Sequence, residues 1–192
     1  VAGDIIYKDM NGDGFIDGAD QWRIGKNSFP RGNYGIYANL SYKGFSANIL
    51  FQGATSRDMY IEDVVRGQST GGYTMVYPYQ LDYWMPDNTD AKFPRIAMNA
   101  SVNGNNNYVT SDFWLVNGRY IRLKSLQLGY DFRSVLLKNI KWLYKCQVVL
   151  SGQNLFTISP ATKYGFDPEN GSTNNYDYPM QRVYAISLNL GF

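Results

Sequence analysis

The sequence contains no histidine and only one cysteine, Cys146. A single cysteine excludes an internal disulfide framework and a cysteine-based zinc site. Without histidine, the chain lacks the usual general base of enzymes and the commonest soft-metal ligand. Carboxylates remain available, but no arrangement of them indicates catalysis, so we expect neither an enzyme nor a catalytic residue.

Long apolar runs and blocks of like charge are also absent. No stretch of 18 or more apolar residues occurs, so a helical membrane span is not expected. The net charge is +2, from 18 basic and 16 acidic residues, and no basic block stands out. This charge pattern predicts no nucleic-acid partner. A chain that begins at Val1 without methionine or leader is expected to be processed or partial.

Tyrosine and glycine are abundant instead, with 17 and 19 residues. Tyrosine and phenylalanine favour strands, whereas glycine and asparagine favour turns and loops. The composition therefore predicts an all-β chain with polar loops.

Apolar and polar residues alternate in several segments, and this period of two is typical of strands. It predicts about five antiparallel strands, at residues 34–42, 45–53, 118–132, 144–156 and 182–192. The alternation loses its phase before Ser125, where Ile121 and Leu123 are out of step. A β-bulge or a change of environment would explain that loss.

The links between these strands are alternately short and long. About two residues join the first pair and about a dozen join the third and fourth, whereas the other two links hold roughly sixty and twenty-five. Outer-membrane barrels have short periplasmic turns and long outer loops, and structureless loops of such length are unusual in compact soluble domains. We therefore expect residues 1–33 to form an extracellular loop. Residues 34–192 would supply barrel strands with extracellular loops 54–117 and 157–181, and Phe192 would lie on the periplasmic side.

Six stretches are distinctive and occur in one order along the chain. They are GDIIYKDMNGDGFIDGAD (3–20), SYKGFSANILFQG (41–53), YWMPDNTDAKFPR (83–95), GRYIRLKSLQLGYDF (118–132), SGQNLFTIS (151–159) and GFDPE (165–169). Together with the aromatic strand at the end of the chain, they resemble the C-terminal part of SusC/RagA-family TonB-dependent outer-membrane transporters.

This resemblance implies a location in the bacterial outer membrane and a large barrel of about twenty-two strands with an N-terminal plug. It also implies a SusD-like surface lipoprotein as a lid, energy from the TonB complex, and import of glycans or peptides. Barrel width grows with strand number, so five strands cannot enclose a transport lumen. The remainder of the barrel, the plug and the TonB-contacting part are therefore expected in a missing N-terminal part.

The segment from Asp9 to Asp20 matches the spacing of a calcium-binding EF-hand loop. The ligands would be the side-chain oxygens of Asp9, Asn11, Asp13, Asp17 and Asp20 and the backbone carbonyl of Phe15. Gly14 stands at position six, where the loop must turn sharply. Position twelve is aspartate instead of glutamate, and the flanking residues read as extended. We therefore predict a structural Ca²⁺ loop without the helix pair; the alternative is an acidic Asx-turn loop without metal.

The last strand carries a second predicted function. Its apolar face is formed by Tyr184, Ile186, Leu188, Leu190 and Phe192. A terminal aromatic residue with alternating apolar residues resembles the signal that the barrel-assembly machinery reads. The same face would contact outer-membrane lipid.

Aromatic residues are frequent in the long loops: Tyr83, Trp84, Tyr108, Trp114, Tyr164 and Tyr176. They could stack on sugars or contact the lid protein. Packing within the loops, or an interfacial girdle, is the favoured interpretation. Trp142 and Tyr144, by a short link, are expected to be girdle residues.

Two carboxylate pairs, Glu62 with Asp63 and Asp167 with Glu169, are candidates for glycosidase chemistry. Nothing in the sequence fixes their geometry, so loop solubility is the simpler interpretation. Cys146 falls on the apolar face of its strand, which predicts a buried or lipid-facing thiol.

The alternative to a transporter segment is a secreted, calcium-stabilised β-sandwich that binds carbohydrate. It accounts for the metal loop, the tyrosines and the strands. It does not account for the terminal aromatic strand or the alternating link lengths. In a sandwich, Ile186, Leu188 and Leu190 would be packed in a core against a second sheet.

Overall fold

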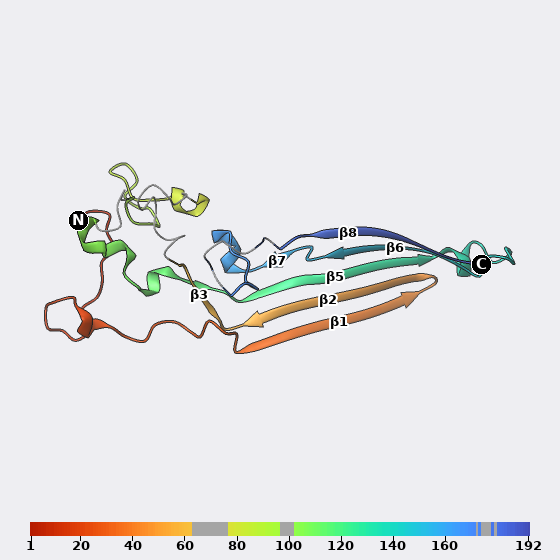
Figure 1. Ribbon diagram of the computed structural model, residues 1–192, viewed down its shortest axis with the longest axis horizontal. Coiled ribbons are helices and arrows are strands. Elements are labelled where there is room, and N and C mark those ends of the chain that lie inside the picture. The colour runs from red at the N-terminus through yellow and green to blue at the C-terminus, as the bar shows by residue number, and fades with distance from the viewer. Residues whose placement is uncertain (63–76, 97–101, 172, 174–177, 179) are drawn as a thin grey trace.

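The structure is a computed structural model that describes residues 1–62, 77–96, 102–171, 173, 178 and 180–192. It is elongated, with a long sheet at one end and a cluster of loops at the other (Figure 1). The N-terminus lies among the loops, and the C-terminus lies at the far end of the sheet (Figure 1).

The main sheet is antiparallel and contains the five expected strands in the order β1-β2-β5-β6-β8. Their bounds are β1 (Gly32–Tyr42), β2 (Phe45–Thr55), β5 (Tyr120–Asp131), β6 (Lys145–Gln153) and β8 (Val183–Gly191). A two-residue strand, β7 (Thr157–Ile158), also pairs with β5. The all-β prediction is confirmed. Within the described residues the sheet is open, since β1 and β8 each pair with one strand.

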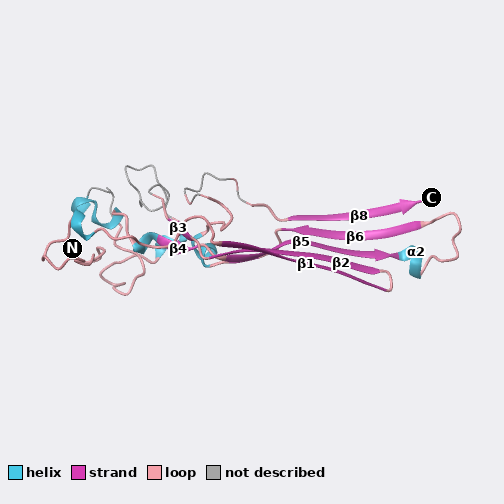
Figure 2. Cartoon of the chain, turned by 90° about the horizontal axis from the view of Figure 1, so that it is seen from below, coloured by secondary structure: helices cyan, strands magenta, loops and turns pink. Residues whose placement is uncertain are grey.

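Short and long links lie at opposite ends of the sheet (Figure 2). Lys43 and Gly44 join β1 to β2 and have φ values of 44° and 85°. Two consecutive positive φ values are what a tight hairpin turn requires. At the same end, α2 (Phe132–Val135) begins the link from β5 to β6. We call this the turn end, and the opposite end the loop end.

Two strands end earlier than the alternation predicted. β5 stops at Asp131 instead of 132, because the Asp131 carboxylate caps α2 by accepting from the N–H groups of Arg133 and Ser134. β6 stops at Gln153 instead of 156, because Asn154 adopts a left-handed conformation with φ of 53°. The chain then resumes its pairing with β5 as β7.

The loss of phase in β5 is a β-bulge. Leu50 of β2 is opposite Ser125, but the next residue, Phe51, is opposite Leu123. Lys124 is therefore the extra residue of the bulge. The shift returns Leu123 and Ile121 to the apolar face of the sheet, as the sequence interpretation required.

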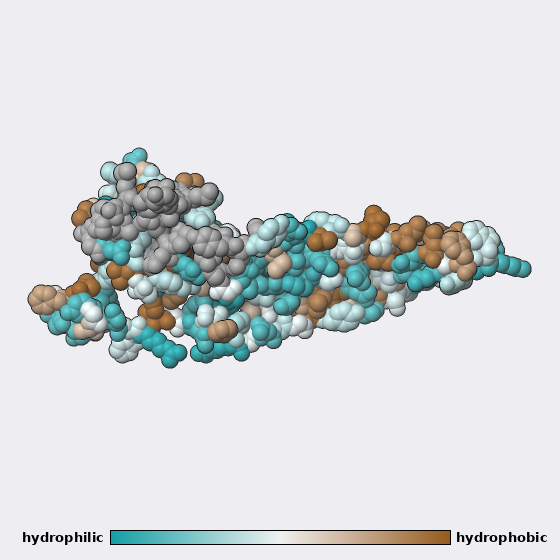
Figure 3. All heavy atoms as spheres, viewed as in Figure 1, coloured by the Kyte–Doolittle hydropathy of each residue, from teal (hydrophilic) through white to brown (hydrophobic). Residues whose placement is uncertain are grey.

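The apolar face of the sheet is open to the surroundings. Ile186, Leu188 and Leu190 are 76%, 59% and 48% exposed, so no second sheet of the described residues covers them. Hydrophobic side chains gather over the sheet, and hydrophilic ones over the region where strands meet loops (Figure 3). This arrangement contradicts the sandwich alternative, which needs these side chains in a core.

The loop end has a core of its own. β3 (Asp58–Tyr60) and β4 (Leu115–Asn117) pair with each other just beyond the paired strands β2 and β5. The buried cluster consists of Met59, Ile61, Trp114, Val116, Ala161 and Phe166. Segment 54–117, expected as a loop, thus contains regular structure that a hydrophobic core supports.

Short 3-10 helices complete the loop end. They are η1 (Gly18–Asp20), η3 (Pro78–Leu81), η4 (Val102–Tyr108), η5 (Asp112–Trp114) and η6 (Pro160–Tyr164). Within the described ranges, no helix has the length and apolar character needed to cross a membrane.

Candidate functional site

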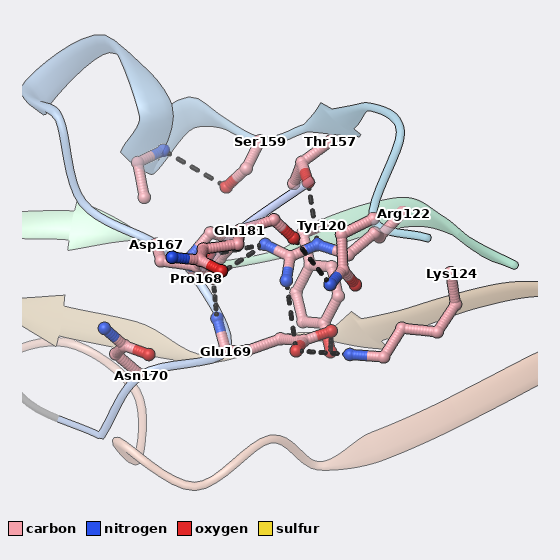
Figure 4. Close-up of polar contacts among 12 residues, drawn as sticks. Tyr120, Arg122, Lys124, Thr157, Ser159, Asp167, Pro168, Glu169, Asn170 and Gln181 are labelled. Carbon is pink, nitrogen blue, oxygen red and sulfur yellow. Dashed lines mark hydrogen bonds and ion pairs between the residues drawn. The ribbon is translucent and has the colours of Figure 1, made fainter. Parts of the chain in front are cut away.

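Four charged residues meet where the polar face of β5 enters the loop end. Arg122 and the bulge residue Lys124 lie on β5 and point toward the segment that follows η6, which carries Asp167 and Glu169 (Figure 4). The two basic residues are two positions apart in a strand, so they share a face. We call this group the β5 ion-pair network.

The network is closely paired. One Arg122 nitrogen, Nη2, donates to both oxygens of Asp167, at 2.7 and 2.8 Å. Arg122 Nε donates to Thr157 Oγ1 at 2.7 Å, and Lys124 Nζ donates to Glu169 Oε2 at 2.8 Å. Arg122 Nη1 lies 3.1 Å from the same Glu169 oxygen but without hydrogen-bond alignment. Two cations and two carboxylates therefore neutralise one another.

Burial strengthens these contacts. The Arg122 side chain is 3% exposed, and those of Asp167 and Glu169 are 17% and 14% exposed. An ion pair away from water is screened less than a surface pair, and losing one partner leaves an uncompensated charge. Both carboxylates are held by cations, so the glycosidase interpretation gains no support. The network fastens the loop after η6 to the sheet.

A second arginine holds the same loop from the other side. Arg57 is buried and donates to the backbone carbonyls of Pro168, at 2.7 Å, and Asn170, at 3.1 Å. The Asp167 carboxylate also accepts from the backbone N–H of Glu169 at 2.9 Å. Residues 167–170 are thus fixed on β5 and next to β3.

The loop-solubility interpretation of Asp167 and Glu169 was therefore wrong. A signal for the correct answer was present in the sequence: both the basic and the acidic pair have a spacing of two residues. Of the other pair, Glu62 donates its backbone N–H to Thr173 Oγ1 at 3.0 Å, and Asp63 lies outside the described residues.

The predicted calcium loop is closed by its own hydrogen bonds. The carboxylate of Asp9 accepts from the backbone N–H groups of Gly12, at 2.5 Å, and Gly14, at 2.8 Å. Asp13 accepts from the N–H of Phe15 at 2.8 Å. The two glycines have φ values of 79° and 87°, which supply the sharp turn.

Asp20 ties the end of this loop to its beginning. Its carboxylate accepts from the N–H groups of Asp17, at 2.9 Å, and Met10, at 2.7 Å, and these bonds lower its pKa. Asp17 accepts from Ala19 N–H, and Asn11 from Asp13 N–H. In the described ranges, no three acidic or cysteine side chains converge as metal ligands. The loop thus has the turn geometry that a calcium loop needs, and calcium binding stays a prediction.

The aromatic and apolar residues of the last strand lie where the alternation predicts. Leu190, Leu188 and Ile186 are opposite Cys146, Val148 and Leu150 of β6, which all belong to the apolar face. At the turn end, the Phe192 ring stacks on Trp142, with centroids 5.7 Å apart and planes at 6°. Its role as an assembly signal stays a prediction.

Turn-end aromatics also fit the girdle prediction by position. Trp142 and Tyr144 are exposed, at 67% and 70%, and Tyr144 donates its backbone N–H to the carbonyl of Gly191. Both residues therefore lie beside the end of β8.

Loop aromatics, in contrast, are packed. Trp114 is buried and its indole N–H donates to the Asn107 carbonyl at 3.0 Å. Tyr164 stacks on Phe166 at the edge of the buried cluster. Three further aromatics, Tyr83, Trp84 and Tyr108, are half-buried, and Tyr176 lies outside the described residues. The packing interpretation is supported for Trp114 and Tyr164.

Comparison with known proteins identifies relatives along the whole chain, although no family model matches it. TonB-dependent receptor P39 of Formosa agariphila is 29% identical over 204 residues, which cover 99% of this chain and 19% of that protein. TonB-dependent receptor SusC of Bacteroides thetaiotaomicron is 26% identical over 193 residues, covering 97% and 17%. The chain therefore spans about a fifth of the length of the curated relatives it matches.

Solved structures show the same fold. The RagAB peptide importer in its open-open state has a TM-score of 0.67 at 24% identity, with 93% of this chain and 19% of that chain covered. The closed-closed state gives 0.65 at 23% identity, with 94% and 20% covered. The sequence relationship and the shared sheet agree with the resemblance seen in the sequence. Over nearly its whole length the chain is thus similar to a segment of the SusC/RagA-like TonB-dependent receptors.

Proposed function

We propose that this chain forms part of the wall of a TonB-dependent importer in the bacterial outer membrane. The observation that carries the proposal is the two-faced sheet, with an exposed apolar face and a polar opposite face. An apolar face of this extent has a low free energy only in contact with lipid or protein. The remainder of the barrel and a plug would complete the pore, and the TonB complex would act on parts outside this chain.

The polar face supplies the groups that would line the import path. Tyr37, Asn48 and Gln127 lie on neighbouring strands, and their side chains form a short hydrogen-bonded row. The β5 ion-pair network continues this face at the loop end. The loop after η6 would therefore be folded over the polar side of the wall, where it narrows the pore entrance.

The cargo class we propose is glycans or peptides, delivered with a SusD-like lipoprotein as the lid. Relatives named SusC and RagAB support this assignment, and the latter is described as a peptide importer. The buried core of the loop end supports it further, because a rigid platform suits a docked lid. Polar cargo also suits a path lined by amides and hydroxyls.

An uptake assay tests the proposal. A strain that lacks the complete transporter gene would receive either the native gene or one with Ile186→Arg and Leu188→Arg, which place charge on the apolar face. We expect native cells to import fluorescent oligopeptides or oligosaccharides and cells with the variant not to. Equal uptake by both strains, with both proteins present in the membrane fraction, would contradict the wall assignment.

We also propose that the loop from Asp9 to Asp20 holds a structural Ca²⁺, with the side chains of Asp9, Asn11, Asp13, Asp17 and Asp20 and the carbonyl of Phe15 as ligands. The turn geometry at Gly12 and Gly14 supports it. Hard carboxylate oxygens favour this ion. The ion would relieve the mutual repulsion of four carboxylates in a short segment.

Finally, we propose that Phe192 and the apolar face of β8 are read by the barrel-assembly machinery. The support is the exposure of these side chains and the stacking of Phe192 on Trp142 at the turn end. Phe192→Ser should lower the amount of folded transporter in the outer membrane, measured by quantitative immunoblotting. An unchanged amount would contradict this role.

A further inference from the structure

A groove with a volume of about 700 Å³ lies at the loop end of the sheet, where β1, β2, β5 and β7 meet the loops. Apolar-face residues Tyr34, Ile121 and Ile158 line it. Exposed Lys26, Arg119 and Lys163 line it as well. We call it the basic groove.

Three cations here face no acidic residue of the groove. No ion pair within the described residues involves Lys26, Arg119 or Lys163, and no aspartate or glutamate lines the groove. The neighbouring carboxylate of Asp58 accepts from the backbone N–H of Lys26 at 2.6 Å but is not part of the lining. The groove is therefore positive and fits an anionic group.

The apolar part of the groove is preformed. The hydroxyl of Tyr34 donates to the Tyr120 carbonyl at 3.1 Å, which holds the ring across Gly53. A Cβ at Gly53 would collide with Cζ of the Tyr34 ring, so only glycine lets the ring lie there. Ile158 is 66% exposed beside Ile121. An apolar surface next to three cations matches an amphiphile with a negative head.

A second groove on the same face provides a contrast. It has a volume of about 570 Å³, lies at the turn end, and is lined by residues such as Leu40, Phe45 and Leu128 with no charged side chain. Hydrocarbon chains suit that surface without any preference for a headgroup. Of these two grooves on the apolar face, the basic groove alone carries charge, and this favours an anionic lipid at the loop end.

We propose that the basic groove binds a membrane lipid with a phosphate headgroup. Its phosphate would lie among Lys26, Arg119 and Lys163, and its acyl chains would run over Ile158 and Ile121 toward the turn end. This inference rests on the proposed function, because it requires the apolar face to lie in a bilayer. Basic side chains at a bilayer surface attract anionic lipid, each strengthening binding roughly five-fold.

The test compares lipid retention by variants of the complete transporter. Native protein and the triple variant K26Q/R119Q/K163Q would be reconstituted in nanodiscs of phosphatidylcholine with phosphatidic acid, extracted in mild detergent and analysed by native mass spectrometry. We expect native protein to retain phosphatidic acid over phosphatidylcholine. The triple variant should retain at least about ten-fold less phosphatidic acid. Retention by native protein should also fall as sodium chloride is raised.

Two matched variants control for charge and folding. K138Q/K141Q/K145Q removes three exposed lysines near the turn end and should retain the lipid as native protein does. K26R/R119K/K163R keeps all three charges and should retain it too. Equal loss in the turn-end variant would overturn the inference, because any three cations would then suffice. Displacement of the lipid by millimolar inorganic phosphate would also overturn it, because a free anion would then be the ligand.

The membrane fraction separates this inference from the proposed function. A transporter found in membranes that shows no preference for phosphatidic acid overturns the inference alone. A protein recovered without membranes overturns the proposed function, and the inference with it.

Discussion

Apolar side chains are buried in one region of this chain and exposed in another. At the loop end, Trp114, Ile61 and Phe166 are buried, as in a water-soluble protein. On the sheet, residues of the same kind such as Ile186 and Leu188 are more than half exposed. In the first region the hydrophobic side chains are removed from water by packing against one another. In the second they have no such packing, and only an external apolar phase would remove them from water.

Polar groups show the same inversion. Arg57 and Arg122 at the loop end are buried and paired with carbonyls or carboxylates. On the sheet, the polar face carries the side-chain hydrogen bonds between Tyr37, Asn48 and Gln127, and all three residues are at least partly exposed. The contrast teaches that apolar and polar side chains are distributed in opposite ways in the two regions, and that the boundary between them lies where β2 and β5 enter the loops.

The largest effect is expected from Trp114→Ala in the loop core. Truncating a buried aromatic residue typically destabilises a protein by about 3–5 kcal/mol. Trp142→Ala is the matched control, since Trp142 is 67% exposed at the turn end and loses only its stacking on Phe192. The complete transporter in micelles would be unfolded with denaturant, and cleavage of its loops by protease would report the unfolding. This measures the loss of stability in each of the two variants. A similar loss of stability in Trp114→Ala and Trp142→Ala would contradict the contrast between a packed loop end and an exposed sheet.

Arg122→Met should have the next largest effect. It leaves Asp167 and Glu169 without their buried partner, which costs about 3 kcal/mol. We expect the loop after η6 to become sensitive to protease while the strands stay protected. The double variant with Asp167→Asn should cost less than the sum of the two single changes, because the residues act as a pair. Additive effects would contradict the network.

A charge on the apolar face should cost somewhat less. Ile186→Arg places a cation at the middle of β8, and such a change on a lipid-facing strand costs at least about 2 kcal/mol. Its neighbour Ser187 lies on the polar face, so Ser187→Arg should be nearly neutral. Unfolding in lipid vesicles measures both variants. A reversed order of the two costs would assign the faces the other way round.

Calcium should produce the smallest effect and act only at the loop end. At ten times its dissociation constant, a bound ion stabilises the loop by about 1.4 kcal/mol. Differential hydrogen exchange with and without calcium would show protection of residues 9–20. Asp13→Asn and Asp17→Asn together should remove that protection. Protection that persists in this variant, or never appears, would favour the Asx-turn alternative.

The strands were predictable because a sheet with one apolar and one polar face gives its sequence a local period of two. All five strands of the main sheet were located to within about three residues. The loss of phase before Ser125 has a bulge or a change of environment as its explanation in the sequence, and the structure shows the bulge, at Lys124. The predicted strand ends were wrong where the conformation of a single residue ends the strand. Asn154 is one example, since its left-handed conformation is a tertiary choice.

The equal two-residue spacing of the basic and acidic pairs is compatible with the β5 ion-pair network, but no local pattern predicts that the two pairs meet. Arg122 and Asp167 are 45 positions apart, and their contact depends on how η6 turns the chain back onto β5. The structure inside segment 54–117 was missed for the same reason, because its buried residues come from distant positions such as Met59 and Trp114. Long-range packing has no fixed spacing in a sequence.

Spin-label accessibility on β8 tests the central claim most directly. In a Cys146→Ala background of the complete transporter, one label would be placed at Ile186→Cys and another at Ser187→Cys, and both proteins reconstituted in lipid vesicles. Oxygen concentrates in the bilayer, and a polar nickel complex stays in water. We predict that the label at 186 collides mainly with oxygen and the label at 187 mainly with the nickel complex. A label at 186 that prefers the nickel complex would contradict the assignment of this face to lipid.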